Sequence, residues 1–180
     1  ALKILQLLKG KKVVHNDIKF ENFIVTSEYP FEIILTDFES AQIVNENDQS
    51  NISSGTSIFK APEVLEKMPH DYKADLWSLG VNIFYHLYFE YPFNIQETEN
   101  CSMFENVIKE KIFTYNIQRK ENDRVSDDAW ECITALLEKD PIKRITVEDA
   151  LSLKWFLHID ENESKLDHKC NLNQDFQCIV

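Results

Sequence analysis

One run in the chain has the composition of a helix that is buried on every side. Residues 71–89, DYKADLWSLGVNIFYHLYF, place apolar side chains on nearly every face of a helix that Asp71 can begin. A helix without a polar face packs at the centre of a protein. A strand is a weaker interpretation, because the run is about three times as long as a typical strand. The sequence therefore predicts a helical bundle around this segment.

Further segments predict helices that surround the central one. In residues 1–10, ALKILQLLKG, leucines recur at helical spacing, and the chain opens inside this pattern without Met, as a piece of a longer protein would. Ser126 is the predicted N-cap of the helix SDDAWECITALLEK, whose first turn carries two aspartates. Thr146 and Asp149 have the T-x-x-D spacing of a capping-box variant before ALSLKWF.

The rest of the chain predicts one hairpin, one long loop and a tail. Short apolar runs, FIV at 23–25 and EIILTD at 32–37, flank the turn SEYP and predict paired strands. Residues 40–57 are polar without a period, which predicts a long exposed loop. Residues 159–180 have the character of a poorly packed tail. The predicted fold class is mainly α, with a small β-hairpin beside the polar stretch HNDIKFEN at 15–22.

Charge and cysteine content argue against several classes of protein. The net charge is −12 and the 19 Lys and Arg residues are scattered, which argues against nucleic-acid binding and favours basic partners. The cysteines lack C-x-x-C spacing, so neither a zinc site nor a redox motif is indicated for Cys101, Cys132, Cys170 and Cys178. No apolar run reaches the roughly eighteen residues that span a bilayer. We expect an intracellular, cytoplasmic protein without a membrane partner.

Four polar side chains are set around the predicted hairpin at positions that let them converge. Asp17, Lys19 and Asn22 precede its first strand, and Asp37 follows its second. Carboxylate and amide oxygens suit Mg²⁺, and an ammonium neutralises charge on a transferring phosphoryl group. The alternative is a polar turn between a helix and a strand, with no chemistry.

These residues belong to motifs that resemble those of eukaryotic protein kinases. The kinase patterns H-R-D with a following Asn, D-F-G and A-P-E appear here as HND with Asn22, as DFE at 37–39 and as APE at 61–63. The runs DLWSLG and DPIKRIT continue the likeness. The resemblance covers residues 1–158 and implies the large helical C-terminal lobe of a kinase, most similar to the calcium/calmodulin-dependent group, with the N-terminal lobe absent.

Carried over position by position, the resemblance implies a reaction. Asp17 would orient the substrate hydroxyl and accept its proton, and Lys19 would meet the γ-phosphate of ATP. Asn22 and Asp37 would hold the two Mg²⁺ ions that bridge the ATP phosphates. The substrates would be proteins, and basic ones would suit the acidic charge.

The resemblance also implies roles around the reacting groups. Thr56, in G-T-x-x-x-x-A-P-E, together with Lys19 is similar to the serine/threonine-specific version of these motifs. Glu21 resembles a carboxylate that reads a substrate arginine, with an exposed loop charge as the alternative. Three further assignments are structural: His15 as a brace of the catalytic loop, Asp75 as a support of its backbone, and Glu63 as the partner of Arg144.

Two residues depart from the kinase pattern. Asn16 replaces the arginine of H-R-D, and a neutral amide cannot pair with a phosphorylated activation loop, although Ser53 and Ser54 are available for modification. Glu39 replaces the glycine of D-F-G, which predicts a stiffer loop and a third carboxylate near the metal ions.

The nucleotide-covering parts of a kinase have no counterpart in the chain. The glycine-rich loop, the strand lysine and its helix glutamate are missing, so the 180 residues alone are expected to show negligible turnover of Mg-ATP. The leading hypothesis is therefore a serine/threonine kinase that works together with the missing N-terminal lobe of the same chain. The alternative is a pseudokinase-like scaffold or regulatory module without phosphotransfer.

Overall fold

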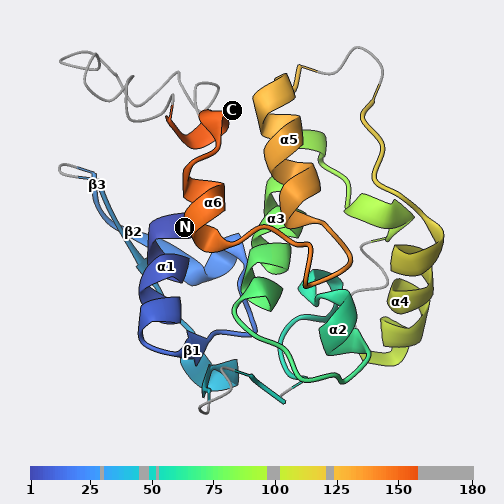
Figure 1. Ribbon diagram of the computed structural model, residues 1–180, viewed down its shortest axis with the longest axis horizontal. Coiled ribbons are helices and arrows are strands. Elements are labelled where there is room, and N and C mark those ends of the chain that lie inside the picture. The colour runs from blue at the N-terminus through green and yellow to red at the C-terminus, as the bar shows by residue number, and fades with distance from the viewer. Residues whose placement is uncertain (29–30, 45–48, 52, 97–101, 121–123, 158–180) are drawn as a thin grey trace.

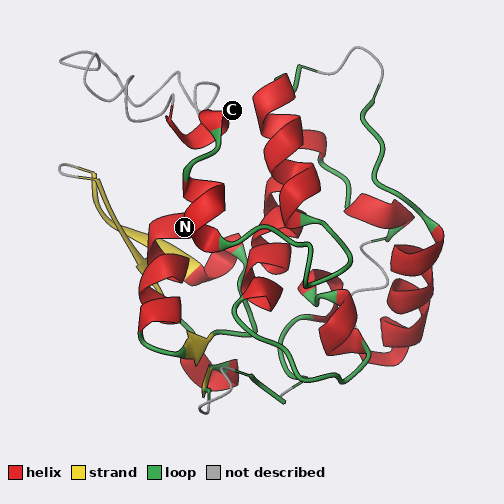
Figure 2. Ribbon diagram, in the orientation of Figure 1, coloured by secondary structure: helices red, strands yellow, loops and turns green. Residues whose placement is uncertain are grey.

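Helix α3 (Lys73–Tyr88) occupies the centre of the molecule, with the other helices arranged around it (Figures 1 and 2). The computed structural model describes residues 1–28, 31–44, 49–51, 53–96, 102–120 and 124–157. The surrounding helices are α1 (Leu2–Gly10), α2 (Pro62–Leu65), α4 (Glu105–Thr114), α5 (Asp127–Leu136) and α6 (Val147–Leu151). The structure agrees with the predicted mainly α architecture.

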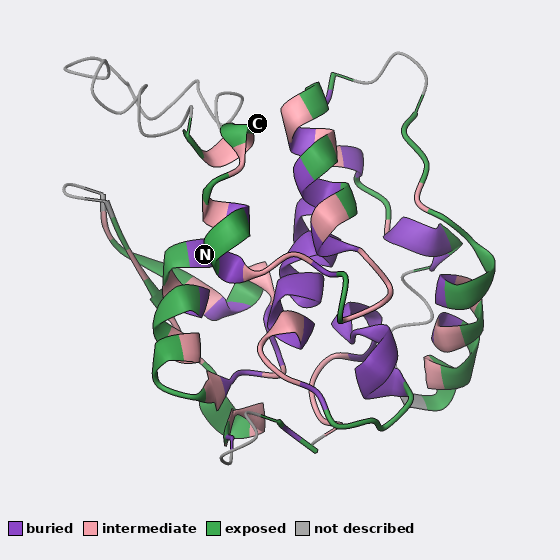
Figure 3. Ribbon diagram, viewed as in Figure 1, coloured by how far each residue is buried: buried purple, intermediate pink, exposed green. Residues whose placement is uncertain are grey.

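Helix α3 is buried on all sides, as its sequence predicts. Twelve of its 16 residues are buried, whereas the outer helices α1 and α4 expose one face to solvent (Figure 3). The helix begins at Lys73, two residues later than predicted, and Asp71 Oδ1 accepts the N–H of Lys73 at 2.7 Å. The N-cap residue is Tyr72, which makes no side-chain cap hydrogen bond, and Asp71 stands one residue before it.

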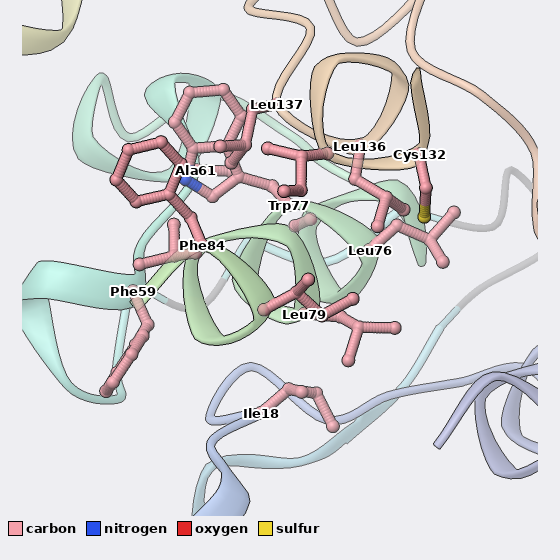
Figure 4. Close-up of a cluster of buried hydrophobic side chains, with 14 of the residues drawn as sticks. Ile18, Phe59, Ala61, Leu76, Trp77, Leu79, Phe84, Cys132, Leu136 and Leu137 are labelled. Atoms are coloured by element: carbon pink, nitrogen blue, oxygen red, sulfur yellow. The ribbon is translucent and has the colours of Figure 1, made fainter. Parts of the chain in front are cut away.

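The centre of the core is the contact between α3 and α5 (Figure 4). Gly80 makes this contact possible, because a Cβ at this position would lie 2.8 Å from the Cβ of Leu136. Trp77 is fully buried on the same helix, and its ring stacks on Phe93 with centroids 5.4 Å apart. Close approach of two helices explains why a glycine stands inside an otherwise strong helical run.

The N-caps predicted for the last two helices, α5 and α6, are present. Ser126 Oγ accepts the N–H of Ala129 at 3.1 Å at the start of α5. Thr146 Oγ1 accepts the N–H of Asp149 at 3.1 Å at the start of α6, and its hydroxyl donates to Asp149 Oδ2 at 2.7 Å. The threonine acts as the capping box predicts, but the aspartate binds the threonine hydroxyl instead of a backbone N–H.

Two small antiparallel sheets lie beside the helices. The predicted hairpin consists of β2 (Phe23–Glu28) and β3 (Phe31–Leu35), with Phe23 paired to Leu35. The second sheet joins β1 (Val13–Val14) to β4 (Gln42–Ile43). Along the chain, the polar stretch 15–22 follows β1 and leads into β2 through a 3₁₀ turn, η1 (Phe20–Asn22).

The prediction of a long exposed loop over residues 40–57 is wrong in part. Its start forms strand β4, and Ser50 is 0% exposed because it forms an antiparallel bridge with His70. Ser57 is also buried, at the start of the 3₁₀ turn η3 (Ser57–Phe59). Polar composition was the only signal for a loop, and it failed because hydrogen bonds from distant residues satisfy these buried polar groups.

Some predictions fall outside the described residues. These are the tail at 159–180 and the cysteines at 101, 170 and 178. Cys132 is a buried free thiol, and burial raises its pKa to about 12. In the described part of the chain, no helix combines the length and the apolar character needed to cross a membrane.

Candidate active site

The polar stretch 15–22 is fixed by two buried polar side chains of α3. Asp75 accepts two backbone hydrogen bonds, from the N–H of His15 at 2.8 Å and from that of Asn16 at 2.9 Å. Asn82 lies two turns further along α3, and its Oδ1 accepts the N–H of Phe20 at 3.0 Å. The same amide donates to the carbonyl of Ile18 at 3.1 Å. Both ends of the loop are therefore tied to the most buried helix of the molecule.

Asp75 was predicted to support the loop, whereas Asn82 was missed. The signal for Asn82 is its position, since it follows Asp75 by seven residues and lies on the same face of a helix that is otherwise apolar. A buried polar residue needs a partner, and here the partner is the loop backbone. Burial raises the pKa of Asp75 to about 7, although the two backbone N–H groups favour its ionised form.

Asp17, Lys19 and Thr56 form one hydrogen-bonded group. Lys19 Nζ lies 2.7 Å from Asp17 Oδ2 and 3.2 Å from Thr56 Oγ1. The other carboxylate oxygen, Asp17 Oδ1, accepts the backbone N–H of Thr56 at 2.8 Å. Burial opposes ionisation of Asp17, but the hydrogen bonds from Lys19 and Thr56 outweigh it and lower the pKa of the carboxyl. The group therefore presents an ionised carboxylate beside an ammonium.

A glycine allows the chain to approach this group closely. Gly55 has φ of +87°, and a Cβ at this position would lie 2.1 Å from the carbonyl oxygen of Asn16. No side chain fits that distance or adopts that φ without strain. Gly55 thus brings Thr56 against Asp17, which gives a physical reason for the G-T spacing in the sequence.

Asn22 and Asp37 lie at the start of β2 and just after β3. Asn22 Nδ2 donates to the carbonyl of Asp17 at 2.9 Å, so its amide oxygen is the atom that can face a cation. The backbone carbonyl of Asn22 accepts both the N–H of Thr36, at 2.9 Å, and the Thr36 hydroxyl, at 3.0 Å. Asp37 follows Thr36 directly and is exposed. The pairing of Phe23 with Leu35 therefore places Asn22 and Asp37 at the same end of the hairpin.

His15 is held as a neutral ring between these groups. Its Nδ1 accepts the N–H of Asp17 at 3.3 Å, so its Nε2 carries the proton and donates to the carbonyl of Thr36 at 3.2 Å. Burial lowers the pKa of His15 and outweighs the nearby carboxylates of Asp17 and Asp37. The ring also meets Phe38 edge to face, with centroids 4.8 Å apart. These contacts are those of a brace, since neither ring nitrogen faces the space beside Asp17 Oδ2.

Glu39, which replaces the glycine of D-F-G, does not occupy a glycine-specific backbone conformation. The left-handed backbone conformation in this segment belongs to Asp37, with φ of +62°. Glu39 lies inside the 3₁₀ turn η2 (Phe38–Ser40), is exposed and does not have a positive φ. The backbone of Glu39 is therefore in a conformation that residues other than glycine adopt without strain.

Asn16 forms a hydrogen-bonded network that the sequence did not predict. Its Nδ2 donates to the carbonyl of Ser40 at 3.0 Å, and its Oδ1 lies 2.8 Å from Nε2 of the buried His70. Ser50 adds to it, because its hydroxyl donates to Gln42 Oε1 at 2.7 Å while its backbone pairs with His70. At the position of the arginine in the kinase pattern, this chain has an amide that bonds Ser40 and His70, beside the segment after β4.

The remaining predicted residues have clear positions. Glu63, in α2, and Arg144 form a buried pair, with Oε1 and Nη1 2.6 Å apart and Oε2 and Nη2 2.9 Å apart. Glu21 is exposed on η1, and its predicted contact with a substrate arginine stays a prediction.

The donor atoms present suit magnesium bound together with a nucleotide. In the described ranges, no three His, Cys, Asp or Glu side chains gather as a protein-only metal site requires. Mg²⁺ commonly takes only one or two protein ligands and completes its octahedron with water and phosphate oxygens. The Asn22 amide oxygen and the Asp37 carboxylate are such a set, and Lys19 can neutralise phosphate charge beside them.

Comparison with known proteins agrees with this geometry. Residues 1–156 match the family model described as "Protein kinase domain". A "Probable myosin light chain kinase" of Dictyostelium discoideum is 33% identical over 160 residues, which cover 89% of this chain and 32% of that protein. "Calcium-dependent protein kinase 3" of Plasmodium yoelii yoelii is 36% identical over 155 residues, 85% of this chain and 28% of that protein.

A third relative is described as a "Probable serine/threonine-protein kinase" of Dictyostelium discoideum. It is 28% identical over 191 residues, which cover 89% of this chain and 32% of that protein. The chain thus spans about a third of the length of these relatives. Because the family model covers nearly the whole chain, the protein belongs to the protein kinase family.

Proposed function

We propose that this chain is the C-terminal lobe of a serine/threonine protein kinase. In this proposal a segment preceding Ala1 supplies the N-terminal lobe, and the complete protein transfers the γ-phosphoryl group of ATP to protein hydroxyls. The observation that carries the proposal is the hydrogen-bonded group of Asp17, Lys19 and Thr56. The calcium/calmodulin-dependent group is the subfamily we favour, from the sequence resemblance.

Each residue of the group has a task that its position supports. Asp17 Oδ2 can accept a proton from a substrate hydroxyl, because the carboxyl is ionised and its other oxygen is held by Thr56. Lys19 donates to Asp17 in the present state and can turn its ammonium to a phosphoryl oxygen. Asn22 and Asp37 would hold Mg²⁺. When bound, Mg²⁺ supplies positive charge that offsets the charge of the phosphates.

The assignment to serine and threonine substrates depends on Thr56. Its hydroxyl contacts Lys19 while its N–H contacts Asp17, so it fixes both reacting side chains from one position. The rival hypothesis, a scaffold without phosphotransfer, gives no reason to keep an ionised carboxylate and an ammonium 2.7 Å apart beside an exposed Asp37. An intracellular location and basic protein substrates remain part of the proposal.

The test is phosphotransfer by the complete protein. Protein that includes the preceding segment should phosphorylate serine peptides with Mg-ATP, and Asp17→Ala or Asp37→Ala should each lower kcat by about 10²-fold or more. Asp127→Asn is the matched control, since this carboxylate is 93% exposed at the start of α5 and should leave the rate unchanged. Residues 1–180 alone should show negligible turnover.

Two outcomes would contradict the proposal. A folded complete protein that transfers no phosphate from Mg-ATP would favour the scaffold. A rate that survives both alanine substitutions would show that the reaction does not use these carboxylates.

A further inference from the structure

A lysine is buried next to the candidate active site and takes no part in the proposed reaction. Lys60 is only 7% exposed and follows the 3₁₀ turn η3. Its Nζ lies 2.6 Å from Glu105 Oε1 and 3.2 Å from the carbonyl of Ser53. Lysines are almost never buried without a partner, and here the partner is the first residue of α4.

The same carboxylate oxygen reaches a second residue of this segment. The Ser57 hydroxyl donates to Glu105 Oε1 at 3.1 Å. Ser57 follows Thr56 directly, and Thr56 contacts both Asp17 and Lys19. The segment that follows Thr56 therefore places an ammonium, a carboxylate and a hydroxyl in one hydrogen-bonded group.

The pair presents its negative member to solvent. The Lys60 side chain is 6% exposed, whereas that of Glu105 is 23% exposed. Both of these hydrogen bonds end on Oε1, which leaves Oε2 as the more available oxygen. Burial opposes ionisation of Glu105, but the hydrogen bond from Lys60 outweighs it, so the pKa of the carboxyl is lowered. An approaching substrate would meet an ionised carboxylate.

We propose that Glu105, held by Lys60 and Ser57, is a specificity residue that selects a basic side chain beside the phosphorylated serine or threonine of the substrate. A lysine or arginine there would donate to Glu105 Oε2. A leucine would cover the carboxylate without replacing its water and would be disfavoured. This inference rests on the proposed kinase function and adds a substrate class to it.

The simpler interpretation is that the ion pair only fastens α4 to the segment 53–60. Buried ion pairs add little stability compared with apolar pairs of similar size, so stability alone gives no reason for lysine and glutamate at these positions. A purely structural pair would not change which peptides are preferred. Peptide preference is therefore the measurement that separates the two roles.

The experiment uses the complete protein and synthetic serine peptides. Each position flanking the serine carries lysine, leucine or aspartate in turn, and kcat/KM is measured for every peptide. At one flanking position the lysine peptide should exceed the leucine peptide by about tenfold, as a hydrogen bond between charged groups permits. Glu105→Gln should remove this preference through KM, while Glu105→Asp should keep part of it.

A matched control exists on the same helix, α4. Glu66, which follows α2, lies 3.4 Å from Lys109 of α4, and both side chains are about one third exposed, at 35% and 37%. Glu66→Gln removes a second ion pair to α4, further along the chain from Thr56, and should leave the lysine preference intact.

A second variant tests the inference if Glu105→Gln destabilises the protein. If Glu105→Gln lowers Tm far more than the control does, Lys60→Met is used instead. It frees Glu105 from its cation, so the preference for lysine should rise by about two- to threefold, a direction that a structural role does not predict.

The outcomes separate the two proposals. If the unmodified protein phosphorylates none of the peptides, the proposed function itself is overturned. Active protein without a lysine preference, or with a preference that Glu105→Gln leaves unchanged, would overturn this inference and leave the kinase function standing.

Discussion

The ion pair between Glu63 and Arg144 allows the sharpest test of how this fold is stabilised. The two side chains are 5% and 0% exposed. Besides Glu63, the guanidinium donates to the carbonyls of Lys73 at 2.9 Å, Glu138 at 2.8 Å and Lys139 at 3.5 Å. These contacts use all five N–H donors of the arginine. Arg144 therefore joins α2, α3 and the loop after α5 in one place.

The perturbation is Glu63→Gln, which keeps the shape of the side chain and removes its charge. The Arg144 guanidinium would then be buried without a counter-charge, and the glutamine NH₂ group, a donor, would face a guanidinium N–H donor. Removing one member of a buried pair costs about 3–5 kcal/mol. A domain has only about 5–15 kcal/mol of stability, so the loss would be a large share of the total.

The assay is unfolding of the chain in urea, followed by tryptophan fluorescence. Trp77 is a suitable reporter because the Arg144 guanidinium lies 5.1 Å from the centroid of its ring. Lys143→Ala is the control next in sequence, since Lys143 is 75% exposed and 3.7 Å from Asp140. An exposed pair of this kind contributes at most about 1 kcal/mol.

A double variant isolates the charge from the packing. Glu63→Leu with Arg144→Met removes both charges, so it should cost less than the sum of the two single changes by about 1–3 kcal/mol. If Glu63→Gln unfolds at the same urea concentration as the Lys143→Ala control, the assignment of this pair as a main support of the fold is wrong.

Two further predictions concern the loop and the segment that covers it. Burial raises the pKa of Asp75 from 3.8 to about 7, so between these pH values the folded state holds a proton that the unfolded state has lost, and stability falls as pH rises across this window. The unfolding free energy should therefore fall by on the order of 1 kcal/mol per pH unit between pH 5 and pH 7 and level off by pH 8, and Asp75→Asn should lack this part of the slope. Phosphate on Ser53 or Ser54 should change kinase activity little, because Asn16 offers no positive charge and already bonds the carbonyl of Ser40 at 3.0 Å. Strong activation of the complete protein by phosphate at either serine, measured with a peptide substrate, would contradict this.

The parts of the site that the sequence predicted are local. Asp17, Lys19 and Asn22 stand within six residues of one another, and a hairpin of two short strands brings Asp37 back to them. The caps at Ser126 and Thr146 also depend on residues three positions away. Short-range geometry fixes such contacts, so spacing in the chain is enough to predict them.

The parts that the sequence did not predict join residues far apart. Asn82 meets Phe20 across 62 positions, His70 meets Asn16 across 54, and Lys60 meets Glu105 across 45. Each involves a polar group that must find a partner once it is buried, and the partner depends on which segments pack together. For the same reason the prediction of an exposed loop over residues 40–57 is wrong at Ser50 and Ser57.

The sequence by itself determined a mainly helical protein around one apolar helix, and a short loop that carries kinase motifs. Only the tertiary structure decided that Asn16 bonds Ser40 and His70 and that Lys60 pairs with Glu105. Periodicity and spacing predict contacts between residues a few positions apart. Which charged groups are buried, and with which partners, depends on how distant segments pack together.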